Sequence, residues 1–117
     1  MSEDIKLLIS IPSYSITFQA MDEETRTPMG YISLKFDKKK KAHLMALIRH
    51  PEFNGLGVCS RLIDEALRFA KAYGIKEVDC GVLNKRVGII KYLRNIGFMD
   101  IETDSDEHTK LLKILDR

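Results

Sequence analysis

The sequence has almost no excess charge of either sign. Nineteen lysine and arginine residues stand against seventeen aspartate and glutamate residues, which leaves a formal net charge of +2. A protein that binds nucleic acid by neutralising phosphates needs a larger basic excess than this. We therefore expect no nucleic-acid partner.

Long apolar runs are also missing. No stretch reaches the roughly 20 apolar residues that span a bilayer as a helix. The first residues include Glu3 and Asp4 ahead of a short apolar stretch, which differs from the basic start of a secretory signal. These features predict a cytoplasmic protein with no membrane partner.

Cysteines are few and widely spaced. Cys59 and Cys80 are the only two, and their separation does not match the paired spacing of zinc sites. We expect both thiols to be reduced and the protein to bind no metal. The sequence has no internal repeat, and its only biased segment is the lysine run at 38–41. With 117 residues and 44% hydrophobic content, residues 1–117 are expected to form a single domain.

The spacing of apolar residues separates predicted helices from predicted strands. Apolar residues recur every three or four positions at 58–73 and 87–95, which predicts two amphipathic helices, each followed by a glycine. Short runs rich in β-branched and aromatic residues predict strands at 5–11, 15–20, 30–36, 42–49, 78–83, 98–102 and 110–115. The order indicates an α/β (α+β) domain, in which an antiparallel meander leads into a β-α-β crossover.

A glycine-containing turn at 54–59 joins the strand at 42–49 to the first helix. Gly55 and Gly57 lack a Cβ, so the backbone there can approach an anion closely, and the free N–H groups at the helix start would attract it. The alternative is that the glycines only allow a tight turn.

The residues around this turn resemble the GNAT N-acyltransferases. That family has a Pro-acidic-aromatic triplet, here residues 51–53, followed by a glycine-containing motif and a helix. Gly57 matches the central glycine of the motif, and Gly55 a position that is often glycine. Residues 92–98 resemble the second family block, which ends in Gly-Phe.

The resemblance implies a mixed, mostly antiparallel sheet of six to seven strands with helices on its faces. Because only residues 12–15 separate the first two predicted strands, the first two family helices would be reduced or absent. An open acceptor cleft follows, suited to a large acceptor or to completion by a second subunit. Exposed edge strands leave room for a homodimer.

Acetyl-CoA is the co-substrate that the resemblance implies. It would lie between the strands at 42–49 and 78–83, with its pantetheine arm pairing with main-chain groups near Leu47 and Arg49. The pyrophosphate would contact backbone N–H groups of Asn54, Gly55, Leu56, Gly57, Val58, Cys59 and Ser60.

The sequence departs from the family at several positions. Asn54 replaces an arginine or glutamine, and Cys59 a glycine or alanine, but the backbone donors remain. Cys59 can be a thiolate nucleophile at a helix start or, more simply, a small buried residue. The usual asparagine before the second helix is replaced by Arg86, with Asn84 nearby.

Many members of the family have a tyrosine that protonates the leaving CoA thiolate, and Leu93 occupies that position here. Tyr92 precedes it, and one helical step turns a side chain by about 100 degrees. Tyr92 therefore cannot simply take over the role of the acid that protonates the leaving thiolate. It remains a candidate for that role, and the alternative is an aromatic packing residue.

Candidate bases lie on the two central strands. Strand alternation predicts that His43 shares a face with Met45, Leu47 and Arg49, and the next strand offers Glu77 and Asp79. We take His43 and Asp79 as candidates. The alternative for each is a solvated surface residue.

Together these features predict an N-acetyltransferase that moves an acetyl group from acetyl-CoA to a primary amine by direct attack in a ternary complex. The acceptor is a small molecule or a protein amine. The alternative is a CoA-binding regulatory or interaction protein with weak or no transferase activity. A purely structural module would bind no CoA.

Overall fold

The computed structural model describes residues 13–37, 40–49 and 57–115. The strand predicted at 5–11 lies outside the described residues, as does the first half of the glycine-containing turn. In chain order the elements are β1 (Ser13–Met21), β2 (Pro28–Asp37), β3 (Lys41–Arg49), α2 (Val58–Tyr73), β4 (Glu77–Leu83), α3 (Val87–Asn95), β5 (Met99–Ile101) and β6 (His108–Ile114).

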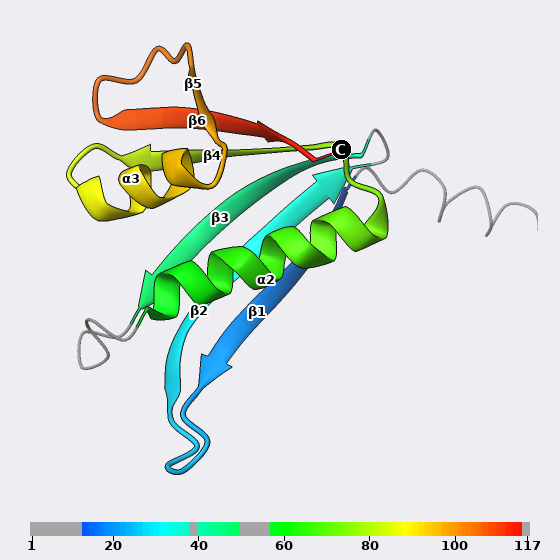
Figure 1. The fold of residues 1–117 in the computed structure, drawn as a ribbon, viewed down its shortest axis with the longest axis vertical. Helices are drawn as coiled ribbons and strands as arrows, with labels where there is room; N and C mark the ends of the chain where they lie inside the picture. Colours follow the sequence, from blue (N-terminus) through cyan, green and yellow to red (C-terminus); the bar gives the residue numbers. More distant parts are fainter. Residues whose placement is uncertain (1–12, 38–39, 50–56, 116–117) are drawn as a thin grey trace, which may run out of the picture.

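The six strands form one sheet in the order β1-β2-β3-β4-β6-β5. Neighbouring strands are antiparallel except β3 and β4, which run parallel and are joined through α2. Figure 1 shows α2 crossing β1, β2 and β3, with α3 lying beside β4 on the same side of the sheet. The predicted α+β class, the meander and the crossover are confirmed. We call the sheet face opposite α2 and α3 the open face.

The two helices begin and end where the sequence pattern predicts. Gly74 takes a left-handed conformation with φ of 94°, and its N–H donates to the carbonyl of Lys71 at 3.1 Å, which ends α2. The predicted strands differ from the observed ones by up to two residues at an end. β6 starts two residues earlier than predicted because Asn84, after β4, bonds to Asp106 and Thr109 and keeps β6 paired as far as Leu83.

The core lies between the sheet and the two helices. Small side chains at Ala66 and Ala70 let α2 approach the sheet closely, since both are fully buried. The largest fully buried side chains are Ile32, Leu34, Ile63, Val78, Leu93 and Leu111. Neither helix in the described part of the chain is long and apolar enough to cross a membrane.

A β-bulge interrupts β3 in its second half. Ser33 pairs with Met45 and Tyr31 with Ile48, so residues 46 and 47 both lie opposite the single residue Ile32. The extra residue reverses which side chains face α2 beyond it. His43 and Met45 lie on the open face, whereas Leu47 packs against the core.

The prediction that four alternate residues of β3 share one face is therefore wrong. These residues are His43, Met45, Leu47 and Arg49. Arg49 pairs with Gly30, whose missing Cβ would point to Val58 at the start of α2, so position 49 also lies on the helix side. The physical reason is the bulge, which strand alternation alone cannot reveal.

Substitution of Gly30 by alanine should destabilise the fold. A Cβ there would sit 2.4 Å from the Ile48 carbonyl oxygen and 3.1 Å from the Arg49 Cα, so backbone would have to move. We expect Gly30→Ala to lower the free energy of unfolding by about 1–3 kcal/mol, measured by urea denaturation. Gly81→Ala is the control, because its Cβ would meet nothing within 4 Å. Equal stability of the two variants would contradict the close β2–β3 approach.

Candidate active site

The two parallel strands separate partway along their length. Residues 41–44 of β3 pair with residues 77–80 of β4, and the last pair is Leu44 with Cys80. Both strands continue beyond this pair, β3 to Arg49 and β4 to Leu83, and they diverge as Figure 1 shows. The main-chain groups of β3 that face the gap are therefore not used by β4. This is the splayed geometry that the family resemblance implied.

A cleft of about 170 Å³ lies where the strands separate. Its walls are mostly apolar: Leu44 and Leu47 come from β3, Val82 from β4, and Ile63 and Leu93 from the helices. Arg86 and His108 also line it, and Arg86 bears the only permanent positive charge among the lining residues.

Arg86 bridges the two sides of the separation. Its Nη1 donates a hydrogen bond of 3.1 Å to the main-chain carbonyl of Leu47. Arg86 immediately precedes α3, while Leu47 belongs to β3, so the guanidinium spans the cleft from one wall to the other. Sequence reasoning noted this arginine only as a replacement for an asparagine. Its position directly before the helix of the second family block was the available signal.

The start of α2 has backbone donors with no partner among the described residues. Gly57 adopts a left-handed conformation with φ of 71°, and its carbonyl accepts from the Arg61 N–H at 3.1 Å. The Ser60 hydroxyl also donates to that carbonyl, at 2.9 Å. In the described residues no side chain caps this end, and the first turn carries no acidic residue. The N–H groups of Val58, Cys59 and Ser60 can thus receive an anion.

Some of the predicted cofactor residues cannot be placed. Asn54, Gly55 and Leu56 lie outside the described residues. Leu47 borders the cleft, and Arg49 ends β3 close to the start of α2, as its pairing with Gly30 requires. Every predicted cofactor residue that the structure describes therefore lies along one path, from the α2 N-terminus to the cleft.

Both cysteines are buried and unpaired. Cys59 is 7% exposed and packs on the sheet side of α2, which favours a small packing residue over a nucleophile. Cys80 lies at the point where β3 and β4 separate. Burial, with a smaller contribution from the neighbouring Asp79 carboxylate, raises the pKa of its thiol to about 12. Cys80 therefore stays uncharged at neutral pH.

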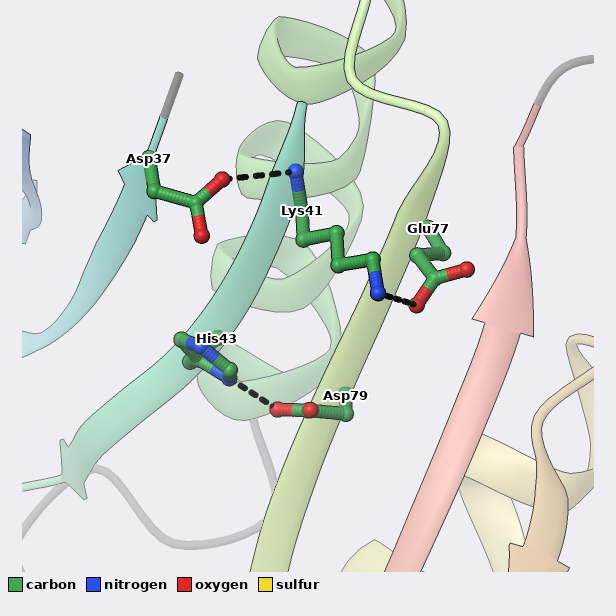
Figure 2. A network of polar contacts seen from close by, with 5 residues as sticks. All are labelled: Asp37, Lys41, His43, Glu77 and Asp79. Atoms are coloured by element: carbon green, nitrogen blue, oxygen red, sulfur yellow. Dashed lines mark hydrogen bonds and ion pairs between the residues drawn. The ribbon is translucent and has the colours of Figure 1, made fainter. Parts of the chain in front are cut away.

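His43 and Asp79 form a pair on the open face. They are direct partners in the β3–β4 register, and the Nδ1 atom of His43 contacts the Asp79 carboxylate. Figure 2 shows the imidazole of β3 and the carboxylate of β4 pointing toward each other, beside the ion pair of Lys41 and Glu77. The Nε2 atom of His43 has no partner within the described ranges. A carboxylate on one ring nitrogen orients the ring and leaves the other available for proton transfer.

The open face is hollowed at the same point. A depression of about 530 Å³ is lined by Lys35, His43 and Asp79. It shares with the cleft the residues Leu44, Met45, Cys80 and Gly81. The cleft and this depression therefore approach the strand separation from opposite faces of the sheet.

Tyr92 points away from the cleft, toward α2. Its hydroxyl donates a 2.5 Å hydrogen bond to the Asp64 carboxylate. Burial, followed by the bond and the charge of Asp64, raises the pKa of Tyr92 to about 12. Its neighbour Leu93 is 2% exposed and faces the cleft instead. The one-residue offset noted in the sequence thus separates the phenol from the cleft.

Comparisons with known proteins agree on one family. The acetyltransferase (GNAT) family model matches residues 3–98. An uncharacterised N-acetyltransferase of Methanocaldococcus jannaschii is 30% identical over 83 residues, which are 64% of this chain and 36% of that relative. The chain thus spans little more than a third of the length of this curated relative.

Solved structures share the fold. The PaiA N-acetyltransferase from Thermoplasma acidophilum, in complex with coenzyme A, is 26% identical with a TM-score of 0.73, covering 97% of this chain and 67% of that one. A ribosomal-protein alanine N-acetyltransferase from Escherichia coli has a TM-score of 0.77 at 12% identity, covering 100% and 78%. A GNAT-family acetyltransferase from Staphylococcus aureus has a TM-score of 0.75 at 16% identity, covering 87% and 68%.

The Tyr92–Asp64 bond should stabilise the packing of α3 on α2. We expect Tyr92→Phe to lower the free energy of unfolding by about 1 kcal/mol, and a double-mutant cycle with Asp64→Ala to give a coupling of similar size. The raised pKa favours the protonated phenol in the folded state. The contribution is therefore complete below about pH 10 and is lost as the pH rises through about 12.

The control is Tyr73→Phe, because the Tyr73 hydroxyl has no hydrogen-bond partner within the described part of the chain. Urea denaturation at pH 8 and at pH 11 measures both variants. Zero coupling between positions 92 and 64 at pH 8 would contradict the bond.

Proposed function

Because this chain belongs to the acetyltransferase (GNAT) family, we propose that it transfers the acetyl group of acetyl-CoA to a primary amine. The observation that carries the proposal is the separation of β3 and β4 beyond Leu44 and Cys80, next to a helix N-terminus that no side chain caps within the described residues. An acyl donor and an amine can meet at this point from opposite faces of the sheet. Direct attack in a ternary complex needs that arrangement.

The proposed cofactor path follows polar main-chain groups at the start of α2 and in the second half of β3. The N–H groups of residues 58–60, with Gly57 and the preceding Asn54, Gly55 and Leu56, would hold the pyrophosphate. Main-chain groups of Leu47 and Arg49 would pair with the pantetheine amides as an added strand does. The cleft of about 170 Å³ then receives the thioester end. Coenzyme A bound to the Thermoplasma relative supports this use of the fold.

His43 is proposed to accept the proton of the amine, with Asp79 as its partner. In the tautomer that donates Nδ1–H to Asp79, the Nε2 atom of His43 carries the lone pair and can accept a proton. Asp79 then stabilises the imidazolium that forms. Their place on the open face, beside the depression of about 530 Å³, supports amine approach from that side.

The amine acceptor is proposed to be large, such as a protein amine. The depression on the open face is wide rather than enclosed, and charged side chains of both signs, Lys35 and Asp79, line it. Such a surface suits a polar chain segment better than a small apolar metabolite.

Tyr92 is proposed to pack rather than to donate a proton. Its bond to Asp64 and its pKa of about 12 both disfavour release of the proton, and Leu93 occupies the wall of the cleft. The same observations favour a second candidate function, a CoA-binding protein with weak or no transferase activity. The two candidates differ in what His43 does.

CoA binding should be sensitive to charge at position 57. We expect Gly57→Asp to weaken acetyl-CoA binding by roughly tenfold or more in calorimetric titration, because a carboxylate there repels the pyrophosphate. Gly57→Asn is the matched control: asparagine has the same shape, also tolerates the left-handed conformation and also caps helices. Acetyl-CoA that does not bind the wild-type protein would refute the proposed function.

Removal of the base should slow transfer without affecting the cofactor. We expect His43→Gln to lower the rate of acetyl-CoA-dependent amine acetylation by about 100-fold with unchanged CoA affinity, and Asp79→Asn to lower it less. Lys41→Gln, which removes only an exposed ion pair, is the control and should keep the wild-type rate. The assay measures CoA release with a panel of peptide and small-molecule amines.

CoA binding with no amine-dependent CoA release across the panel would favour the CoA-binding protein. A His43→Gln variant as fast as the wild type would remove His43 from the mechanism.

A further inference from the structure

Arg86 is a charged side chain in a cleft whose other lining side chains are mostly apolar. It is half-buried, and one of its five N–H donors is used by the Leu47 carbonyl. No carboxylate pairs with it in the described ranges. A half-buried cation with no carboxylate beside it in this part of the chain can accept an anionic ligand, whose charge it would balance.

The helix that follows Arg86 adds to the positive potential. Arg86 stands at the N-terminal end of α3, where the helix dipole is positive, and the first turn of α3 contains no acidic residue. A guanidinium at that end is electrostatically unfavourable by itself. An anion bound between Arg86 and the start of α3 would relieve the repulsion.

Neither Tyr92 nor Cys80 is suited to protonate a sulfur that leaves within the cleft. The phenol of Tyr92 is bonded to Asp64 on the α2 side, and Leu93 presents a hydrocarbon side chain. The thiol of Cys80 holds its proton strongly, with a pKa of about 12. His108 also lines the cleft, and its Nδ1 is bonded to the Ser105 hydroxyl.

We propose that Arg86 stabilises the thiolate of coenzyme A as the acetyl group leaves, in place of a proton-donating acid. The inference rests on the proposed function. At about 170 Å³ the cleft has room for only the end of the pantetheine arm, so the sulfur that enters it lies close to the guanidinium. The bond to Leu47 fixes the guanidinium across the cleft before the substrate arrives.

The step balances without another reactant. The amine nitrogen forms a bond to the acetyl carbonyl carbon, and the carbon–sulfur bond breaks with its electron pair going to sulfur. The proton of the amine goes to His43. The sulfur departs as an anion beside the Arg86 guanidinium, and water protonates it after release.

The test compares CoA with desulfo-CoA, which lacks the sulfur. A cation within about 4–6 Å lowers the pKa of an acidic group by roughly 1–3, so the protein should prefer the thiolate form of CoA. We expect wild-type affinity for CoA, relative to desulfo-CoA, to rise roughly tenfold between pH 7 and pH 9.5 in calorimetric titrations. In Arg86→Gln, which keeps a donor for Leu47, the ratio should stay flat.

Two further variants isolate the guanidinium. Arg86→Lys keeps the charge and should retain part of the rise. His108→Gln removes the imidazole that also lines the cleft and should retain all of the rise, while Cys80 and its neighbour Asp79 are the same in every variant compared. Desulfo-CoA corrects for pH effects on the phosphates.

Each result decides between the hypotheses. The same rise in Arg86→Gln as in the wild type, or no rise in a wild-type protein that binds CoA, would overturn the role of Arg86 and leave the proposed function standing. A wild-type protein that binds neither CoA nor desulfo-CoA would overturn both.

Discussion

The separation of two parallel strands is the constraint on which the rest of the site depends. β3 and β4 pair only as far as Leu44 and Cys80. The bulge opposite Ile32 bends β3 directly after that pair, and Gly30 lets β2 follow it without a side chain in the way. Without this bend, β4 would continue to occupy the β3 main-chain groups that the proposed cofactor would use.

The same separation gives the two faces of the sheet different chemistry. On the helix side, apolar residues of β3, β4, α2 and α3 enclose a small cleft with one cation, Arg86. On the open face, His43 and Asp79 lie side by side with polar neighbours. In the proposed reaction, the acyl donor would meet mostly apolar side chains on one side of this point, and the amine would meet groups able to take its proton on the other.

The position of α3 decides which polar side chains reach the cleft. α3 turns Leu93 inward and Tyr92 toward Asp64, so the phenol contributes to helix packing and not to the cleft. Arg86, one residue before the helix, contributes the positive charge instead. A site that stabilises a departing anion by a nearby positive charge needs no general acid whose pKa matches that of the leaving group.

The sequence by itself determined the elements, the class and the family. Periodicities of 3.6 and 2 are local, so the bounds of α2 and α3 and the order of the strands could be read directly, and Gly57 and Gly97 marked the two family blocks. Tertiary structure alone decided which face each site residue occupies. The bulge moved Leu47 and Arg49 to the helix side, strand register joined His43 to Asp79, and Arg86 reached Leu47 across 39 residues of chain. Those contacts depend on pairing between distant segments, which no local pattern encodes.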